Sequence, residues 1–306
     1  MGGKNFFNII MAPNTTVDDT AKNMGLRELA GKTIAIDASH LIHRAITAFS
    51  GLKDVKGELT THLNTVFNTI VMLAKAKIEQ LWIFDADGLN TKKHKEHVKR
   101  RAIREKQKLM GKDVYSLTSQ HLQEIQNLLD YMGQPWIRVP QGYEAEQIGA
   151  WLTKSSSEMP AFCEAVLSGD SDVLLFGGKL MRPVKQKSAS GKSSKTIYKF
   201  YDPEVICNIS GLSHERILKA GLVLGTDFCD KTIGIGVATA IKKSEKLELT
   251  EEQRIAQEFF QEFPPLDKLE KHFSEFDKNK TLEFLTSRGF SKELKEKQLT
   301  AYEKCI

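Results

Sequence analysis

The most informative stretch of the sequence is Thr33-Ile34-Ala35-Ile36-Asp37-Ala38-Ser39. Its β-branched residues predict a short buried strand, and Asp37 stands where that strand ends and a helix can begin. Residues 61–77 then place apolar side chains at helical spacing, and Leu81-Trp82-Ile83-Phe84 predicts a second buried strand that ends at Asp85. Strand, helix and strand in this order predict a parallel sheet with a right-handed crossover.

The rest of the chain continues this alternation and therefore predicts an α/β fold, with a mostly parallel central sheet flanked by helices. The sequence shows no internal repeat and no long linker. We expect further strands at residues 136–139, 165–167, 173–176 and 196–201, helices that reach residues 132 and 153, and mostly helix after residue 213.

The composition is that of an ordinary folded protein rather than a repetitive or disordered one. The chain has 306 residues, of which 41% are hydrophobic and 27% charged, and this length suffices to bury a large core. No apolar run reaches the ~18 residues that a membrane-spanning helix needs, so we expect no membrane association. The four cysteines form no Cys-x-x-Cys pair, which favours a reducing compartment and argues against a zinc ribbon.

The net charge of +5 conceals two basic segments on an acidic body. Residues 92–108 hold nine Lys and Arg against two Glu, residues 185–199 hold five Lys and no acid, and the remainder carries −7. The first segment could be a solvated helix face or an address signal, but its position directly after the strand that ends at Asp85 favours contact with phosphates. Residues 185–195 predict a flexible loop, which could touch a polyanion or be a solvated hairpin.

Acidic residues occupy the same topological position four times. Asp37, Asp85, the pair Glu144/Glu146 and the pair Asp170/Asp172 stand where the chain leaves the sheet, and the carboxyl ends of such strands line one crevice. Any one of them could simply cap a helix, but six carboxylates that meet must either bind cations or take up protons. Oxygen ligands without neighbouring His or Cys favour Mg²⁺ or Mn²⁺, and two such ions could activate water against a phosphodiester.

Five motifs stand in order along residues 1–245. They are the stretch 33–39, Trp82-Ile83-Phe84-Asp85, Tyr143-Glu144-Ala145-Glu146, Gly169-Asp170-Ser171-Asp172, and Leu224-Gly225-Thr226-Asp227-Phe228-Cys229 followed by Gly234-Ile235-Gly236. Together they resemble the flap endonuclease (XPG-type) family of structure-specific 5′ nucleases. The resemblance implies a PIN-like 5′-nuclease fold, with a helical arch and a helix–two-turn–helix DNA-binding module. It also implies hydrolysis of DNA at single-strand/double-strand junctions by two Mg²⁺ ions, for which Mn²⁺ could substitute.

The resemblance implies roles for individual residues. The metal ligands would be Asp37, Asp85, Glu144, Glu146 and Asp170 in a first group and Asp172 and Asp227 in a second. Lys93 and Arg100 lie two helical turns apart and would be the catalytic cations that hold the scissile phosphate, a task that Lys92 or Lys99 could share. Further DNA contacts are implied for Gly2, His43, Arg101, Arg104, Gly234, Gly236, Lys242 and Lys243, and the glycine hairpin could also bind K⁺.

Some positions depart from the family pattern. His43 stands in place of an aromatic residue that stacks on a base, residues 11–24 look like an extra polar loop, and residues 237–240 are neutral where the family is basic. The segment between Asp85 and Glu144 is short, which implies a trimmed arch. A 5′→3′ exonuclease or a junction resolvase therefore stays the main alternative to a flap endonuclease. An RNA 5′ exonuclease and a non-catalytic DNA-binding scaffold are the weaker alternatives.

We expect four regions in the chain: an N-terminal nuclease region (1–105), a helical gateway or arch (86–132), an internal nuclease region with the helix–two-turn–helix module (133–250) and a helical C-terminal extension (251–306). The expected protein is a monomer that binds branched or flapped DNA, in the nucleus or, if it is viral, in a cytoplasmic factory. Residues 253–260 resemble a box for binding a sliding clamp, although Phe259, Phe260 and Phe263 more simply form the apolar face of a helix.

Overall fold

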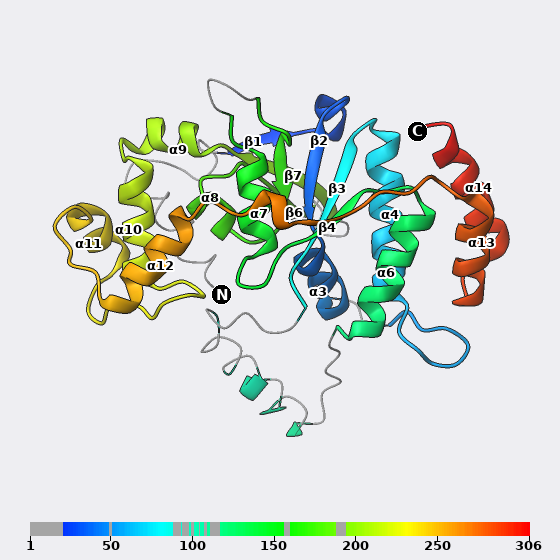
Figure 1. The fold of residues 1–306 in the computed structure, drawn as a ribbon, viewed down its shortest axis with the longest axis horizontal. Helices are drawn as coiled ribbons and strands as arrows, with labels where there is room; N and C mark the ends of the chain where they lie inside the picture. Colours follow the sequence, from blue (N-terminus) through cyan, green and yellow to red (C-terminus); the bar gives the residue numbers. More distant parts are fainter. Residues whose placement is uncertain are drawn as a thin grey trace.

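The computed structural model describes residues 21–48, 51–87, 93, 98, 101–103, 105–106, 109–110, 117–155, 160–187 and 194–306. Figure 1 shows a central sheet with helices on both of its faces. This arrangement confirms the α/β fold that the sequence predicts, and no helix within the described ranges combines the length and the apolarity needed to cross a membrane.

The central sheet has eight strands in the order β1-β7-β6-β5-β2-β3-β4-β8. Its inner five strands, from β6 to β4, run parallel, and antiparallel strands complete both edges. The strands are β1 (Ala21–Met24), β2 (Thr33–Asp37), β3 (Glu79–Phe84), β4 (Trp136–Arg138), β5 (Ala165–Leu167), β6 (Leu180–Lys187), β7 (Ser194–Tyr201) and β8 (Glu270–His272).

The helices begin where the sequence offers capping side chains. The hydroxyls of Thr118, Ser213 and Thr250 accept hydrogen bonds from backbone amides of α6, α10 and α12. The helices are α3 (Ala38–Ala48), α4 (Thr61–Lys75), α6 (Ser119–Tyr131), α7 (Ala145–Leu152), α8 (Asp172–Leu175), α9 (Pro203–Ser210), α10 (His214–Leu224), α11 (Val237–Lys243), α12 (Glu251–Gln261), α13 (Lys278–Ser287) and α14 (Lys292–Glu303), with short 3₁₀ turns at Leu26–Leu29 and Leu266–Lys268.

The sheet separates two hydrophobic cores, because successive residues of a strand point to opposite faces. Leu81 and Ile83 of β3 lie in a core with side chains of α7, α8, α10 and α12. Trp82 and Phe84 lie in a second core with side chains of α3, α4, α6 and α14. The apolar runs of the parallel strands are therefore continuous rather than alternating, as expected for strands buried on both faces.

Three local predictions differ, in whole or in part, from the described structure. Residues 173–176, predicted as a strand, are buried on all sides and mostly form helix α8, because a short, fully buried apolar run has no periodicity that separates helix from strand. At the ends of the expected loop 185–195, Lys185–Lys187 belong to β6 and residues 194–195 begin β7, and these two strands pair antiparallel, as in the hairpin alternative. Residues 188–193 lie outside the described residues. Of the expected extra polar loop 11–24, residues 21–24 form β1 through pairing with β7, and residues 11–20 lie outside the described residues.

The last part of the chain, after α12, connects the helices on one side of the molecule with the β4 edge of the sheet. After α12 it crosses to the far edge of the sheet, where β8 pairs with β4, and then packs α13 and α14 against α6 and α4 (Figure 1). The rings of Trp136 and His272 stack 3.6 Å apart across this pairing. Gly133 adopts φ +64° in the turn before β4, and a Cβ there would lie 2.7 Å from the backbone nitrogen of Phe276, so this crossing needs glycine.

A group of polar and charged side chains holds this C-terminal part against the rest of the molecule, and we call it the C-terminal ion cluster: His62 and Glu124 are buried, Arg288 is partly buried and Glu58 is exposed. Arg288 donates from Nη2 to Glu124 Oε1 at 2.6 Å and from Nη1 to Glu58 Oε2 at 3.1 Å. The other oxygen of Glu124 lies 2.8 Å from His62 Nε2. Burial would raise the pKa of Glu124, but the hydrogen bonds from His62 and Gln120 and the charge of Arg288 outweigh it and lower that pKa.

Candidate active site

The predicted acidic residues lie at one edge of the sheet because β5, β2, β3 and β4 are consecutive parallel neighbours. Asp37 ends β2, Asp85 follows β3, and Asp170 follows β5. Glu144 and Glu146 stand at the start of α7, shortly after β4. We call the group Asp37, Asp85, Glu144, Glu146, Asp170, Asp172 and Asp227 the carboxylate cluster.

Backbone and hydroxyl donors fix several of these carboxylates. Asp37 Oδ1 accepts from the amide of His40 at 2.9 Å and its Oδ2 accepts from the Ser168 hydroxyl at 3.0 Å. Asp85 Oδ1 accepts from the amide of Ala145 at 2.9 Å, so it caps α7. Asp37 and Asp85 therefore both accept hydrogen bonds at the start of a helix and belong to the carboxylate cluster, so the two explanations of these acids do not exclude each other.

Mutual repulsion links the members of the carboxylate cluster. Burial, followed by the charge of Asp85, raises the pKa of Asp37 to about 7. Burial also raises the pKa of Glu146 well above its usual range, aided by Asp170, Glu144 and Asp37, although Lys93 opposes the shift. The pKa of Asp172 rises for the same first reason, with Asp170 and Asp227 as the repelling neighbours. Each of the seven carboxylates thus lies within the electrostatic reach of another.

Lys93 is a cation inside this cluster. Its Nζ donates to Glu144 Oε2 at 2.9 Å and to Glu146 Oε1 at 3.1 Å, and the side chain is almost fully buried. Burial would lower the pKa of Lys93, but the charges of Glu146, Glu144 and Asp227 hold it well above its usual value. Lys93 is therefore an ammonium ion that neutralises part of the cluster.

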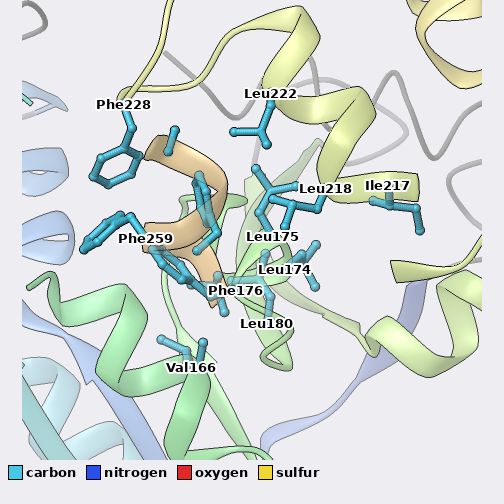
Figure 2. Close-up of a cluster of buried hydrophobic side chains, with 14 of the residues drawn as sticks. Val166, Leu174, Leu175, Phe176, Leu180, Ile217, Leu218, Leu222, Phe228 and Phe259 are labelled. Atoms are coloured by element: carbon cyan, nitrogen blue, oxygen red, sulfur yellow. The ribbon is translucent and has the colours of Figure 1, made fainter. Parts of the chain in front are cut away.

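Phe228 forms the apolar wall beside Lys93, with its ring centroid 4.7 Å from Nζ. The ring belongs to an aromatic group with Phe176 and Phe259 (Figure 2), and it also contacts the ring of Phe260. Because Phe228 is anchored in that core, the neighbouring Asp227 is held toward the carboxylate cluster. Burial of Phe259 and Phe260 confirms that these two residues form a core-facing helix face. The prediction was wrong for Phe263, which lies beyond the end of α12, is 60% exposed and packs edge-on against Trp151.

The donor set fits a hard divalent cation. Neither carboxylate oxygen of Asp172 has a hydrogen-bond partner in the part of the chain that the structure describes, although the residue is only 1% exposed. Such an orphaned buried carboxylate is costly without a cation, and the surrounding ligands are oxygens of the kind that Mg²⁺ prefers. As they stand, no three His, Cys, Asp or Glu side chains of the described residues are arranged closely enough to form a metal cage, so binding would have to draw the carboxylates together.

The other predicted DNA-contacting residues have different outcomes. Gly2, Lys92, Lys99, Arg100 and Arg104 lie outside the described residues. Arg101 is exposed and bonds to Glu105 at 3.2 Å. His43 is exposed on α3, and Lys242 and Lys243 are exposed at the end of α11. Gly234 adopts φ +81°, and open space surrounds the Cβ positions of Gly234 and Gly236, so the hairpin backbone is accessible.

Sequence reasoning missed two supporting residues. The hydroxyl of Ser168 donates to Asp37 and accepts from the amide of Asp170 at 3.1 Å, so it joins two strand ends. Its position directly before Gly169-Asp170 could have indicated this role. His40 packs against Gly169, where a Cβ would lie 2.4 Å from the imidazole Nε2. Gly169 therefore leaves space for the His40 ring beside Asp170, and no local sequence pattern predicts this contact.

Comparison with known proteins defines the class to which this arrangement belongs. Residues 1–107 match the XPG N-terminal domain and residues 133–227 match the XPG I-region. The chain belongs to the flap endonuclease (XPG-type) family of structure-specific 5′ nucleases.

Among individual relatives, the chain is 31% identical over 252 residues to flap endonuclease 1 of Nanoarchaeum equitans, a match that covers 74% of this chain and 72% of that protein. It is 26% identical over 333 residues to flap endonuclease 1 of Thermofilum pendens, covering 95% and 93% of the two chains. The second match therefore includes most of the C-terminal extension.

Solved structures share the fold. Flap endonuclease-1 from Methanococcus jannaschii matches with a TM-score of 0.72 at 21% identity, over 94% of this chain and 96% of that one. The catalytic core of Rad2 in complex with DNA substrate matches with 0.67 at 21% identity, over 92% and 96%. Human GEN1 in complex with Holliday junction DNA matches with 0.65 at 18% identity, over 99% and 78%.

Proposed function

We propose that this nuclease hydrolyses DNA phosphodiesters near single-strand/double-strand junctions with two divalent metal ions, Mg²⁺ by preference. The observation that carries the proposal is the carboxylate cluster itself, with its raised pKa values and the two unpartnered oxygens of Asp172. Family membership and the fold shared with DNA-bound nucleases support the same reaction class.

The roles of the chain's own residues follow from their positions. Asp37, Asp85, Glu144, Glu146 and Asp170 would hold one ion, and Asp172 and Asp227 would complete the second site. Such ions lower the pKa of a bound water and stabilise the leaving oxygen. Ser168 keeps Asp37 oriented, and the amide of Ala145 keeps Asp85 oriented. Lys93, once outside the Glu144–Glu146 pair, would hold the scissile phosphate together with Arg100.

DNA binding would extend beyond this centre. The exposed Lys242 and Lys243 and the open backbone at Gly234 and Gly236 could contact duplex phosphates, and K⁺ binding at this hairpin stays a prediction. A monomer in a nucleus or a viral factory also stays a prediction. We do not include a sliding clamp, since Phe259 and Phe260 pack inside the protein rather than on its surface.

A panel of labelled substrates tests the proposal and its main alternatives. We expect a short 5′ product from a flapped duplex in Mg²⁺ and none in EDTA. Preference for a nicked or gapped duplex would instead indicate a 5′→3′ exonuclease, and paired cuts in a four-way substrate would indicate a resolvase. Asp170→Asn should abolish cutting while DNA binding, measured by anisotropy, stays within about threefold. Equal product from this variant and the wild type would contradict the metal assignment.

A further inference from the structure

The side chain of Lys93 stands where a metal ion would be expected. Its ammonium group bridges Glu144 and Glu146 at 2.9 and 3.1 Å, and these are two of the carboxylates assigned above to metal binding. The residue comes from the basic segment 92–108, whose expected partner is phosphate. A cation from the gateway is therefore bound inside the acidic centre.

We propose that Lys93 is an internal counter-ion of the metal-free enzyme, which a divalent ion must displace from Glu144 and Glu146 before the centre can work. The displaced ammonium is then available to the scissile phosphate. This inference rests on the proposed function, because it takes Glu144 and Glu146 as metal ligands. It adds an exchange step in which the Lys93 ammonium first binds the carboxylates of Glu144 and Glu146 and then the scissile phosphate.

The exchange follows from the charges and the burial. Glu144 is 7% and Glu146 8% exposed, and buried carboxylates need a cation or a proton. Lys93 supplies one positive charge through two charge-assisted hydrogen bonds. A divalent ion on the same oxygens would stand within a few ångströms of the ammonium, and two cations at that separation repel strongly in a poorly solvated site. Lysine and metal therefore bind these carboxylates alternately.

The lysine should weaken the apparent affinity for metal. Only molecules in which Lys93 has moved away from Glu144 and Glu146 can bind the ion. The observed dissociation constant for the metal is therefore the intrinsic constant divided by the fraction of molecules in that state. Bound DNA should oppose this effect, because its phosphates give the ammonium a new anionic partner. Metal and DNA binding are thereby coupled through one residue.

Binding of Mn²⁺ to the metal-stripped full chain, without DNA, tests the exchange. Free Mn²⁺ can be measured by electron paramagnetic resonance for the wild type, Lys93→Met and Lys106→Met. Methionine keeps much of the length of lysine without its charge. Lys106→Met is the matched control, because it makes the same substitution at an exposed lysine of the same basic segment.

We expect Lys93→Met to bind Mn²⁺ on the order of tenfold more tightly than the wild type, since one charge-assisted hydrogen bond lost from the competitor suffices for that change. Lys106→Met should stay within about twofold of the wild type, because an exposed charge is screened. Equal or weaker binding by a folded Lys93→Met would overturn the exchange.

A second measurement needs no variant. An amine-acylating reagent followed by mass spectrometry reports how accessible Lys93 is, with the exposed Lys106 as the internal reference. Lys93 should react slowly in EDTA and several-fold faster in saturating Mn²⁺, while Lys106 keeps its rate. Unchanged protection of Lys93 in Mn²⁺ would overturn the exchange even if Lys93→Met did not fold.

The outcomes separate this inference from the proposed function. If neither the wild type nor Lys93→Met binds Mn²⁺, the metal centre is wrong and the exchange falls with it. If both bind Mn²⁺ equally and Lys93 stays protected, the metal centre stands and only the exchange is wrong.

Discussion

The C-terminal ion cluster and the carboxylate cluster both place charge in the interior of the described part of the chain, and they differ in how completely the buried carboxylates are paired. In the C-terminal ion cluster both oxygens of Glu124 meet donors from His62, Gln120 and Arg288, and the pKa of that carboxyl is lowered. In the carboxylate cluster seven acids share the single buried ammonium that the structure describes among them, and the pKa values of Asp37, Glu146 and Asp172 are raised.

This difference in charge pairing distinguishes a group that stabilises the fold from a group suited to bind cations. A buried carboxylate whose two oxygens both have donors, as in Glu124, holds elements together without an added cation. A set with excess negative charge is destabilising until cations arrive, and perturbed pKa values of this kind concentrate at functional sites. The same residue types thus serve opposite purposes, and the balance of charge within each group tells which purpose applies.

The largest effect should come from removing charge in the carboxylate cluster. Asp172→Asn should reduce cleavage by at least about 10³-fold, because metal ions supply several kcal/mol of transition-state stabilisation and each 1.36 kcal/mol is a factor of ten. The same change should leave the metal-free protein equally or more stable in EDTA, since it relieves repulsion by Asp170 and Asp227. Cleavage assays and thermal unfolding check both halves. A clear loss of metal-free stability would contradict the contrast between the clusters.

The next effect should come from breaking the paired cluster. Arg288→Met should lower the free energy of unfolding by about 3–5 kcal/mol, because it leaves the buried Glu124 without its guanidinium partner. Urea denaturation measures this loss. Lys278→Met, which breaks the more exposed pair with Glu303, should cost only about 0–1 kcal/mol. Similar losses in the two variants would remove the distinction between buried and exposed pairs.

A smaller, pH-dependent effect should come from Lys295, a buried charge without an ion pair among the described residues. Its Nζ lies 4.0 Å from the Phe67 ring and 5.0 Å from the Phe290 ring, and burial lowers its pKa to about 8. Between that value and the ordinary lysine pKa, the unfolded chain binds a proton that the folded chain has lost. Stability should therefore rise with pH across this window.

Lys295→Met checks this sign. The difference in unfolding free energy between the variant and the wild type should be largest near pH 7, where the wild type buries an ammonium, and should shrink as the pH rises above about 8. A difference that is constant from pH 7 to pH 10 would show that Lys295 stays charged in the folded protein.

The strand-end positions of the first acids can be predicted from the sequence because their signals are local. Asp37 and Asp85 directly follow β-branched or aromatic runs, and parallel strands bring their carboxyl ends to one edge without further information. Helix α4, expected over residues 61–77 and found at Thr61–Lys75, also carries its own periodicity.

The C-terminal ion cluster gives no such signal. His62, Glu124 and Arg288 stand far apart in the chain, and each resembles an ordinary polar residue of a helix or a helix end. The return of residues 270–272 to the sheet edge depends on pairing with β4 rather than on any strong strand pattern. The contact of Lys93 with Glu144 and Glu146 likewise depends on tertiary folding. The spacing of Lys93 and Arg100 in the sequence predicts only that both side chains share one helix face.

The antiparallel pairing of β8 with β4 also governs the order in which this protein can mature on the ribosome. All seven acids have been synthesised by residue 227, yet the outer edge of β4 has no neighbour until residue 272 emerges. Unpaired strand edges and bare apolar helix faces invite association with other chains. The nascent polypeptide therefore contains all seven acidic residues while the outer edge of β4 is still unpaired. Translation must reach β8, α13 and α14 before this sheet edge and the neighbouring helices are covered.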